Sequence, residues 1–253
     1  MYRLLILAAL LALPVLSFGQ APKTVHVFVA LCDNVNQGIV PVPTSLGNGQ
    51  EPHSNLYWGA LYGVKTFFKR SQQWELVQTW KAPEERILER LLFRHKSSGT
   101  YMLADAWDGA HIQPCMAQFV AASSGKESTT IEYDGKTLAF GGQSDCVAFT
   151  GHNGLMEFEV PYVDGVAGKP RAAMILACAA KSYVVDHFKR SKATPVLWTT
   201  GLMAPEAYTL AAALEGWIKG EPTAQVRERA AQAYNKYQKC GISGARRLFD
   251  CSR

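Results

Sequence analysis

The sequence predicts a three-layer α/β sandwich with a mainly parallel central sheet, on three observations. Short apolar runs bounded by turn-forming residues, such as Thr24–Leu31 and Val147–Thr150, are typical of buried strands. These runs alternate along the chain with segments of helical periodicity, which favours parallel strands joined by crossovers. No internal repeat or low-complexity linker interrupts the pattern. We therefore expect residues 22–253 to form a single domain that ends in two helices.

The first half of the chain contains clear local signals for its elements. The β-branched run Thr24–Leu31 predicts the first strand. Asn55 is suited to cap a helix, and Pro83 followed by two glutamates is typical of the start of another. Asp134 and Gly135 predict a hairpin turn. The elements expected in order are a helix at Asn55–Lys69, a strand at Trp74–Trp80, a helix at Pro83–His95, a strand at Tyr101–Ala104, a helix at Ile112–Ala122, and hairpin strands at Thr129–Tyr133 and Thr137–Phe140.

The second half is predicted to complete the sheet and to add the terminal helices. Ala204, Pro205 and Glu206 are typical of a helix start. The expected elements are strands at Val147–Thr150 and Ala172–Cys178, a hairpin excursion at Glu157–Val163, a last strand at Pro195–Thr199, and helices at Ala204–Lys219 and Thr223–Lys239.

Composition indicates an ordinary globular protein of weakly basic charge. The 253 residues are 48% hydrophobic and carry a formal net charge of +5. No dense run of lysine and arginine accompanies this charge, so we expect no nucleic-acid partner.

The first 21 residues have the pattern of a secretory signal peptide. Arg3 precedes the apolar run Leu4–Leu16, and small residues follow it, with a plausible cleavage after Gly19 or Ala21. The run is short for a membrane span, and no later segment reaches that length. The sequence therefore predicts a secreted or periplasmic protein with no integral membrane segment in the mature chain.

The six cysteines suggest disulfides in an oxidising compartment. Cys240 and Cys251 flank a glycine-containing turn and are the preferred pair, whereas the pairing among Cys32, Cys115 and Cys146 stays open. There is no CxxC motif, which disfavours a zinc ribbon or a thioredoxin-like centre. We expect no metal and no cofactor. Asp105 and Asp108 are better explained as capping and loop residues than as a cation site, and the glycine-rich loop Gly38–His53 as a turn at the rim of a site than as a phosphate loop.

The segment Asp145–Tyr183 carries the main candidate chemistry. Its two apolar strands end close to His152 and Cys178. Ligands of open parallel sheets bind beyond the carboxyl ends of the strands, so two adjacent strands would bring this imidazole and this thiol together. A cysteine near its ordinary pKa is mostly protonated at neutral pH, and a neighbouring histidine supplies the activation that it needs. We therefore expect a Cys178/His152 dyad.

These segments resemble the caspase-like cysteine peptidases, a clan that includes caspases, legumains, gingipains and separases. The resemblance rests on Phe149-Thr150-Gly151-His152-Asn153-Gly154, on Leu176-Ala177-Cys178, and on the run from Val196 to Gly201 that leads to Pro205-Glu206-Ala207-Tyr208. The legumain branch is the most similar. The resemblance implies a caspase-like fold and a peptide or protein substrate.

The resemblance also implies roles for individual residues. Cys178 would be the nucleophile and His152 its acid or base partner. The amides of Gly154 and Cys178 would hold the oxyanion. Asp33 or Asn34 would orient His152 or line the specificity pocket, and Thr199, Thr200 and Gly201 would form another pocket wall.

Other interpretations of these residues remain open. A cysteine inside an apolar strand is often plain core packing, and His152 could serve only its own turn. The leading function is a secreted cysteine endopeptidase. The alternative is a catalytically silent caspase-like module that binds a peptide or protein partner, which the extra Asn153 between His152 and Gly154 favours. No GxSxG or HExxH motif occurs, which disfavours a serine esterase or a zinc peptidase. The oligomeric state is not predicted.

Overall fold

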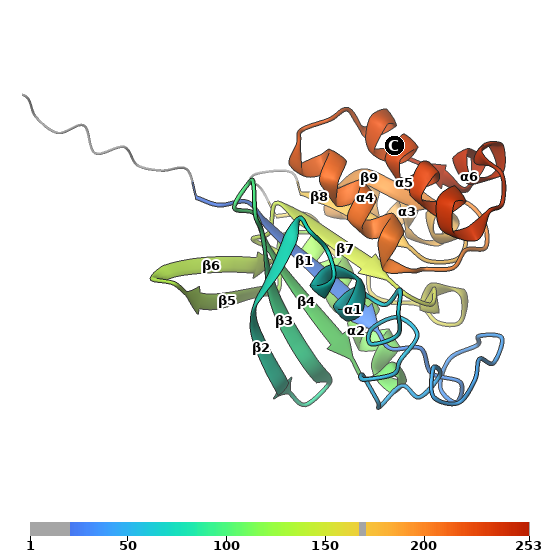
Figure 1. Ribbon diagram of the computed structural model, residues 1–253, viewed down its shortest axis with the longest axis horizontal. Coiled ribbons are helices and arrows are strands. Elements are labelled where there is room, and N and C mark those ends of the chain that lie inside the picture. The colour runs from blue at the N-terminus through green and yellow to red at the C-terminus, as the bar shows by residue number, and fades with distance from the viewer. Residues whose placement is uncertain (1–20, 167–170, 253) are drawn as a thin grey trace, which may run out of the picture.

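Five parallel strands form the centre of an eight-stranded mixed sheet in the computed structural model, which describes residues 21–166 and 171–252 (Figure 1). The expected signal peptide lies outside the described residues apart from Ala21. The strand order is β10-β9-β8-β7-β1-β4-β3-β2. The parallel strands are β1 (Thr24–Ala30), β4 (Tyr101–Trp107), β7 (Cys146–Thr150), β8 (Ala172–Leu176) and β9 (Thr194–Thr199). The antiparallel strands at the edges are β2 (Trp74–Glu84), β3 (Ile87–His95) and β10 (Phe249–Asp250).

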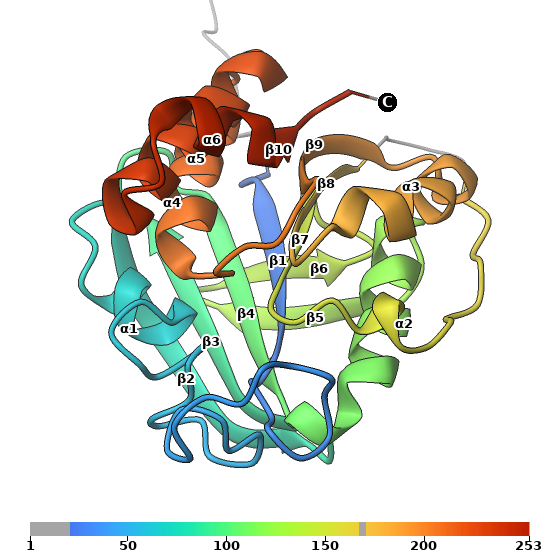
Figure 2. The ribbon, with the colours of Figure 1, turned by 90° about the vertical axis from the view of Figure 1, so that its right-hand side faces the viewer.

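Helices cover both faces of this sheet, so the expected three-layer α/β sandwich is confirmed (Figure 2). One face packs against α1 (Val64–Lys69), α4 (Ala207–Ile218) and α5 (Thr223–Gln238), with α6 (Ile242–Leu248) beside them. The other face packs against α2 (Ile112–Ser123), α3 (Ala180–Ser191) and the hairpin β5 (Ser128–Tyr133) and β6 (Lys136–Gly141). Within the described residues, no helix has both the length and the hydrophobicity needed to cross a bilayer.

Burial on both faces explains why the central strands are apolar throughout. In β1, Val25, Val27 and Val29 point into the core beneath α1, α4 and α5, whereas Phe28 and Ala30 point into the core beneath α2 and α3. A strand that is covered on both sides needs apolar residues at every position, which is typical of parallel sheets. The strands, the hairpin and the helices predicted at Ile112, Ala204 and Thr223 are confirmed, with ends shifted by a few residues.

The helix predicted at Pro83–His95 is wrong, because this segment contains β3. Its side chains alternate between the two faces of the sheet: Leu91 and Phe93 join the core under α1, while Leu92 joins the core under the hairpin, and all three are buried. Ala82 has a positive φ of 42° at the register shift between Lys81 and Glu84 of β2, and the chain turns into β3 at residues 85–86. A strand with apolar residues on both faces lacks the clean alternation that distinguishes a strand from a helix in sequence.

Two further predictions differ from the structure. The helix predicted from Asn55 begins only at Val64, because the Asn55 amide instead bonds the backbone of Cys32 and holds the preceding turns in place. Residues 157–163 form no strand, and Val160 packs against the α2 and α3 core instead. The structure adds three elements that the sequence did not indicate, namely α3, α6 and β10.

All six cysteines, which lie in the described part of the chain, are free thiols in the structure. The disulfide expected between Cys240 and Cys251 is therefore not formed here. Cys240 is exposed and Cys251 half-buried, whereas Cys32, Cys115 and Cys146 are buried.

A buried charge network joins three strands of the sheet to the hairpin. The Arg90 guanidinium donates to both oxygens of Asp105, at 2.6 and 2.8 Å. His26 accepts from the Gly141 amide at Nδ1 and therefore donates from Nε2 to Asp105, at 3.0 Å. Burial alone would raise the pKa of Asp105, but the bonds from Arg90 and His26 hold it below its usual value.

We expect Asp105→Asn to lower the free energy of unfolding by about 3–5 kcal/mol, because it leaves the Arg90 charge buried without its partner. Glu84→Gln is the matched control, since Glu84 is also paired with Arg90 but its side chain is 52% exposed, and it should cost about 1 kcal/mol or less. Since the folded-state pKa of Asp105 is lowered, its contribution is present above the unfolded-state value of about 4 and is lost as the pH falls through the folded-state value. Urea unfolding at pH 7 and in acid measures both effects, and equal losses from the two variants would contradict the assignment.

Candidate functional site

The register of two neighbouring strands places His152 and Cys178 at the same edge of the sheet. β7 pairs in parallel with β8, and the last pair in the ladder is Thr150 with Leu176. His152 and Cys178 each lie two residues beyond that pair. The Gly151 amide donates to the Leu176 carbonyl at 3.2 Å, which continues the contact past the ladder. The predicted meeting of these two chain segments at one sheet edge is thus present in the structure.

The Cys178 thiol lies at the start of the turn that leads into α3. Its Sγ donates to the Met203 carbonyl at 3.6 Å, and the Met203 amide donates to Sγ at 3.4 Å. An N–H group aimed at sulfur stabilises the negative charge that forms when the thiol ionises. The next residue, Ala179, has the left-handed conformation with φ 49°, which costs about 1–2 kcal/mol for a residue with a Cβ.

Burial distinguishes Cys178 from three of the other cysteines. Burial raises the pKa of Cys32 to about 11 and raises the pKa values of Cys115 and Cys146 as well. These three thiols stay protonated at neutral pH and are enclosed by the core. Cys178 is only partly buried, whereas Cys32, which also follows the carboxyl end of a parallel strand, is buried.

His152 is held by a carboxylate that the sequence analysis did not select. The His152 ring is largely buried, with 9% of its side chain exposed, and its Nε2 forms a short contact with Glu157 Oε1. The same oxygen accepts from the Gly38 amide at 2.9 Å. Gly151 has a φ of 152° just before the histidine, a conformation that favours glycine.

Asn153 links the histidine loop to the backbone of the cysteine. It is fully buried, and its Nδ2 donates to the Cys178 carbonyl at 2.7 Å. Its Oδ1 has no hydrogen-bond partner among the described residues. The additional residue between His152 and Gly154 therefore ties the two loops together.

Two backbone amides at this edge take part in none of the loop and turn hydrogen bonds between backbone groups of the described chain. Gly154 opens a 3-10 turn, Gly154–Met156, and a Cβ at this position would lie 2.3 Å from the Phe158 ring. These two amides are those of Gly154 and Cys178. Unpaired N–H groups next to a nucleophile are the donors that an oxyanion requires.

Asp33 and Asn34 bind their own loop and do not contact His152. The Asp33 carboxylate accepts from the amides of Val35 and Asn36 and from the side chains of Asn36 and Gln50. Burial would raise the pKa of Asp33, but these hydrogen bonds hold it below its usual value, so that the group is ionised. Asn34 exchanges two hydrogen bonds with the Val42 backbone. The carboxylate that contacts His152 is that of Glu157 rather than that of Asp33.

The residues predicted as a pocket wall divide into two groups. Thr199 is fully buried, donates to the Ala177 carbonyl and accepts from the Ala180 amide, so it supports the turn around Cys178 from below. Gly201 also supports this turn, because its carbonyl accepts from the Ala179 amide at 2.9 Å. Thr200 instead bonds the carbonyls of Arg247 and Leu248 and lines a separate cavity beside α6.

The loops at the carboxyl edge combine acidic and exposed apolar side chains. Residues 31–63, 108–111, 151–162 and 200–206 contain no lysine or arginine, although the whole chain has a net charge of +5. Their carboxylates are Asp33, Glu51, Asp108, Glu157, Glu159 and Glu206. The β2–β3 turn at the same edge adds Glu85 and Arg86, and the Arg86 carbonyl accepts from the Asp108 amide. Lys181, the first cation after Cys178, is paired with Asp250. The large apolar side chains most exposed on these loops are Val35, Val40 and Leu202, at 87%, 88% and 78%.

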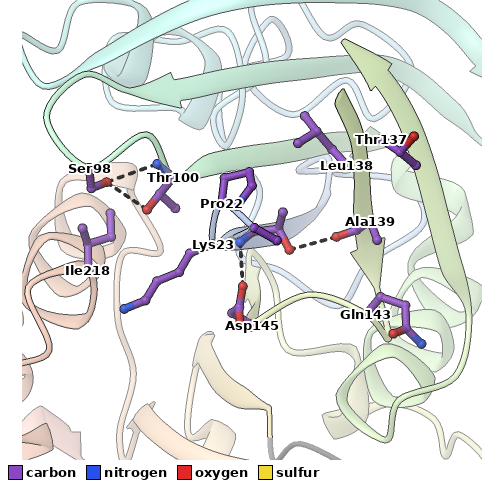
Figure 3. A pocket seen from close by; sticks show the side chains of 12 residues that line it. Pro22, Lys23, Ser98, Thr100, Thr137, Leu138, Ala139, Gln143, Asp145 and Ile218 are labelled. Atoms are coloured by element: carbon purple, nitrogen blue, oxygen red, sulfur yellow. Dashed lines mark hydrogen bonds between the residues drawn. The ribbon is translucent and has the colours of Figure 1, made fainter. Parts of the chain in front are cut away.

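A well-formed cavity of about 580 Å³ lies at the opposite, amino-terminal edge of the sheet (Figure 3). It is lined by Lys23, Thr24 and Asp145 near the start of β1, by Ser98 and Thr100 before β4, and by residues of β6. The length of β1, seven residues or about 20 Å, separates this cavity from the edge of the sheet where Cys178 lies. The hydroxyls of Ser98 and Thr100 bond each other at 2.8 Å. We assign the chemistry to the carboxyl edge, where the thiol and the imidazole lie.

Comparison of the chain with protein-family models, curated proteins and solved structures found no match. Within the described residues, no group of three or more histidine, cysteine and acidic side chains is arranged to hold a metal ion. The structure thus defines an α/β protein with a mostly parallel sheet and a thiol, an imidazole and a carboxylate at its carboxyl edge.

Alkylation of the reduced, folded protein with iodoacetamide at pH 7.5 should separate the cysteines. We expect Cys178, Cys240 and Cys251 to be modified, and Cys32, Cys115 and Cys146 to be protected by at least about tenfold in rate, because burial keeps the latter three protonated and enclosed. Peptide mass spectrometry measures the labelling rate at each cysteine. In protein unfolded in urea, the six cysteines should be labelled at similar rates. Rapid labelling of Cys146 in the folded protein would contradict the assignment.

Proposed function

We propose that the protein is a secreted cysteine endopeptidase of the caspase-like type, in which Cys178 attacks the peptide carbonyl and His152 transfers the proton. The main support is the shared register of β7 and β8, which places the candidate base and the candidate nucleophile at equivalent positions past two adjacent parallel strands. The backbone amides of Gly154 and Cys178 add the donors that acyl transfer needs. The resemblance of these segments to caspase-like peptidases agrees with this chemistry, and the leader-like sequence of residues 1–21 supports export.

The proposed reaction proceeds through an acyl-enzyme. His152 takes the proton of the Cys178 thiol, and the sulfur forms a bond to the substrate carbonyl carbon. The oxygen of that carbonyl becomes negative and accepts from the amides of Gly154 and Cys178. The imidazolium then gives its proton to the leaving amine as the C–N bond breaks. A water molecule, deprotonated by His152, attacks the thioester, and the thiol is restored when the acid product leaves.

A second candidate function is a caspase-like module that binds a peptide without cleaving it. One observation favours it: the Cys178 thiol is hydrogen-bonded to the backbone of Met203 rather than to His152. The same edge, with its apolar and acidic loops, would then serve as a binding surface only.

Replacement of either proposed catalytic residue distinguishes these functions. We expect Cys178→Ala to abolish the cleavage of unfolded protein substrates and His152→Ala to lower kcat/KM by about 10²–10⁴-fold, because the proton transfer is lost. Cys240→Ala, which changes an exposed thiol between α5 and α6, is the matched control and should retain full activity. Assays of fluorogenic peptide mixtures with mass-spectrometric identification of the cleavage sites measure the effect. Peptide binding by the wild-type protein without cleavage would instead establish the binding module.

The acidic loops predict a preference for cationic substrates. Peptides that carry lysine or arginine near the cleaved bond should react about tenfold faster at low ionic strength than matched peptides with aspartate or glutamate, and 0.5 M salt should reduce the difference. The double variant Glu51→Gln, Glu159→Gln removes two charges from the rim and should weaken the preference. A preference for acidic peptides, or one insensitive to salt, would contradict this expectation.

A further inference from the structure

The His152–Glu157 contact is built into the local fold of the loop. After His152, the 3-10 turn Gly154–Met156 reverses the chain, and the Glu157 amide closes it by donating to the Gly154 carbonyl at 2.9 Å. This reversal returns the side chain of Glu157 to the imidazole five residues before it. A carboxylate that accepts from one ring nitrogen fixes both the tautomer and the orientation of the ring.

A second loop holds the carboxylate in place. The Gly38 amide, on the loop after β1, donates to the same Oε1 that contacts His152. A Cβ at Gly38 would lie 2.5 Å from this oxygen. The absence of a side chain at this position therefore permits the approach of Glu157, and the loops after β1 and β7 meet at one carboxylate oxygen.

The contact also determines which ring nitrogen is free to react. Since Nε2 donates to Glu157, the neutral ring carries its proton there, and Nδ1 is left as the acceptor. The hydrogen-bond partners of Asp33 and Asn34 lie in their own loop, so in the described chain the carboxylate that contacts the His152 ring is that of Glu157.

We propose that Glu157, seated on the Gly38 amide, is a positioning residue for His152 that presents Nδ1 as the nitrogen exchanging a proton with the Cys178 thiol. The proposal rests on the peptidase function proposed above. Glu157 touches neither the substrate nor the sulfur in this scheme. It acts by fixing the ring and by stabilising the imidazolium that forms when the thiol gives up its proton.

The test is the pH dependence of Cys178 alkylation by iodoacetamide, followed by mass spectrometry at this cysteine. In general, a thiolate that is paired with an imidazolium reacts even in mildly acidic solution, whereas an ordinary cysteine reacts rapidly in alkaline solution without such a partner. We expect Glu157→Gln to slow alkylation about tenfold at pH 6, the factor given by the loss of one charge-assisted hydrogen bond, and to leave the rate at pH 9.5 unchanged. A merely structural defect would change both rates.

Two further variants make the test specific. Gly38→Ala should reproduce the loss at pH 6, because the added Cβ displaces the carboxylate of Glu157 without removing its charge. Glu132→Gln is the matched control, since it removes an exposed carboxylate from the hairpin strand β5, away from the candidate site, and it should behave as the wild type. In the ¹⁵N NMR spectrum, the His152 ring should be protonated at Nε2 in the wild type and should populate both tautomers in Glu157→Gln.

The possible results are distinguishable. If the wild type alkylates at pH 6 no faster than His152→Ala, the proposed function fails, and the NMR spectrum still tests the role of Glu157. If the wild type is fast, His152→Ala is slow, and Glu157→Gln matches the wild type in rate and in tautomer, the peptidase proposal stands and the positioning role is overturned.

Discussion

The parallel hydrogen-bonded pairing of β7 with β8 is the constraint on which the candidate site depends. His152 and Cys178 lie at the same edge of the sheet because Thr150 of β7 is paired with Leu176 of β8. Successive side chains of a strand point to opposite faces, so a slip of one residue would put Ala177 where Cys178 now lies and would turn the thiol into the other core. Burial on both faces prevents such a slip, because Leu176 and Ala177 already belong to different cores.

The supporting contacts around the thiol come from segments that are distant in sequence. Thr199 is the last residue of β9, Gly201 and Met203 lie between β9 and α4, and Asn153 follows β7, yet all contact the turn at residues 177–180. The left-handed conformation of Ala179 is maintained by these bonds rather than by its own preference. Two other segments, the end of β9 with the loop before α4 and the loop after β7, therefore hold this turn in one conformation, which is the property that a reacting sulfur needs.

Local sequence patterns predict most of the strands and helices, and the wrong predictions have physical causes. The central strands were predictable because burial on both faces gives short, continuous apolar runs. The same feature made β3 ambiguous, since Leu91, Leu92 and Phe93 are all buried and the period of two is hidden. Asn55 has the residue type of a helix cap, but its amide is used in a tertiary contact with Cys32 that no local pattern reveals.

The candidate site was predictable to the extent that strand ends determine it. His152 and Cys178 follow directly from the strands, whereas Glu157 depends on a reversal of the chain that a three-residue 3-10 turn creates. Asp33 is the more obvious carboxylate in the sequence because it follows β1 closely, but the loop after it folds back and supplies it with amide donors. Side chains positioned by loop closure leave no periodic signal in the sequence.

The short strand β10 has a consequence for how copies of this protein can associate. Phe249 and Asp250 pair with Thr199 and Trp198, and the Thr200 amide continues the contact to Leu248. The outer margin of the last parallel strand is therefore occupied by the chain's own tail over these positions. Two molecules cannot join their sheets into one continuous ribbon across that margin unless the tail first detaches, so self-assembly by this route requires the loss of the C-terminal segment from its place.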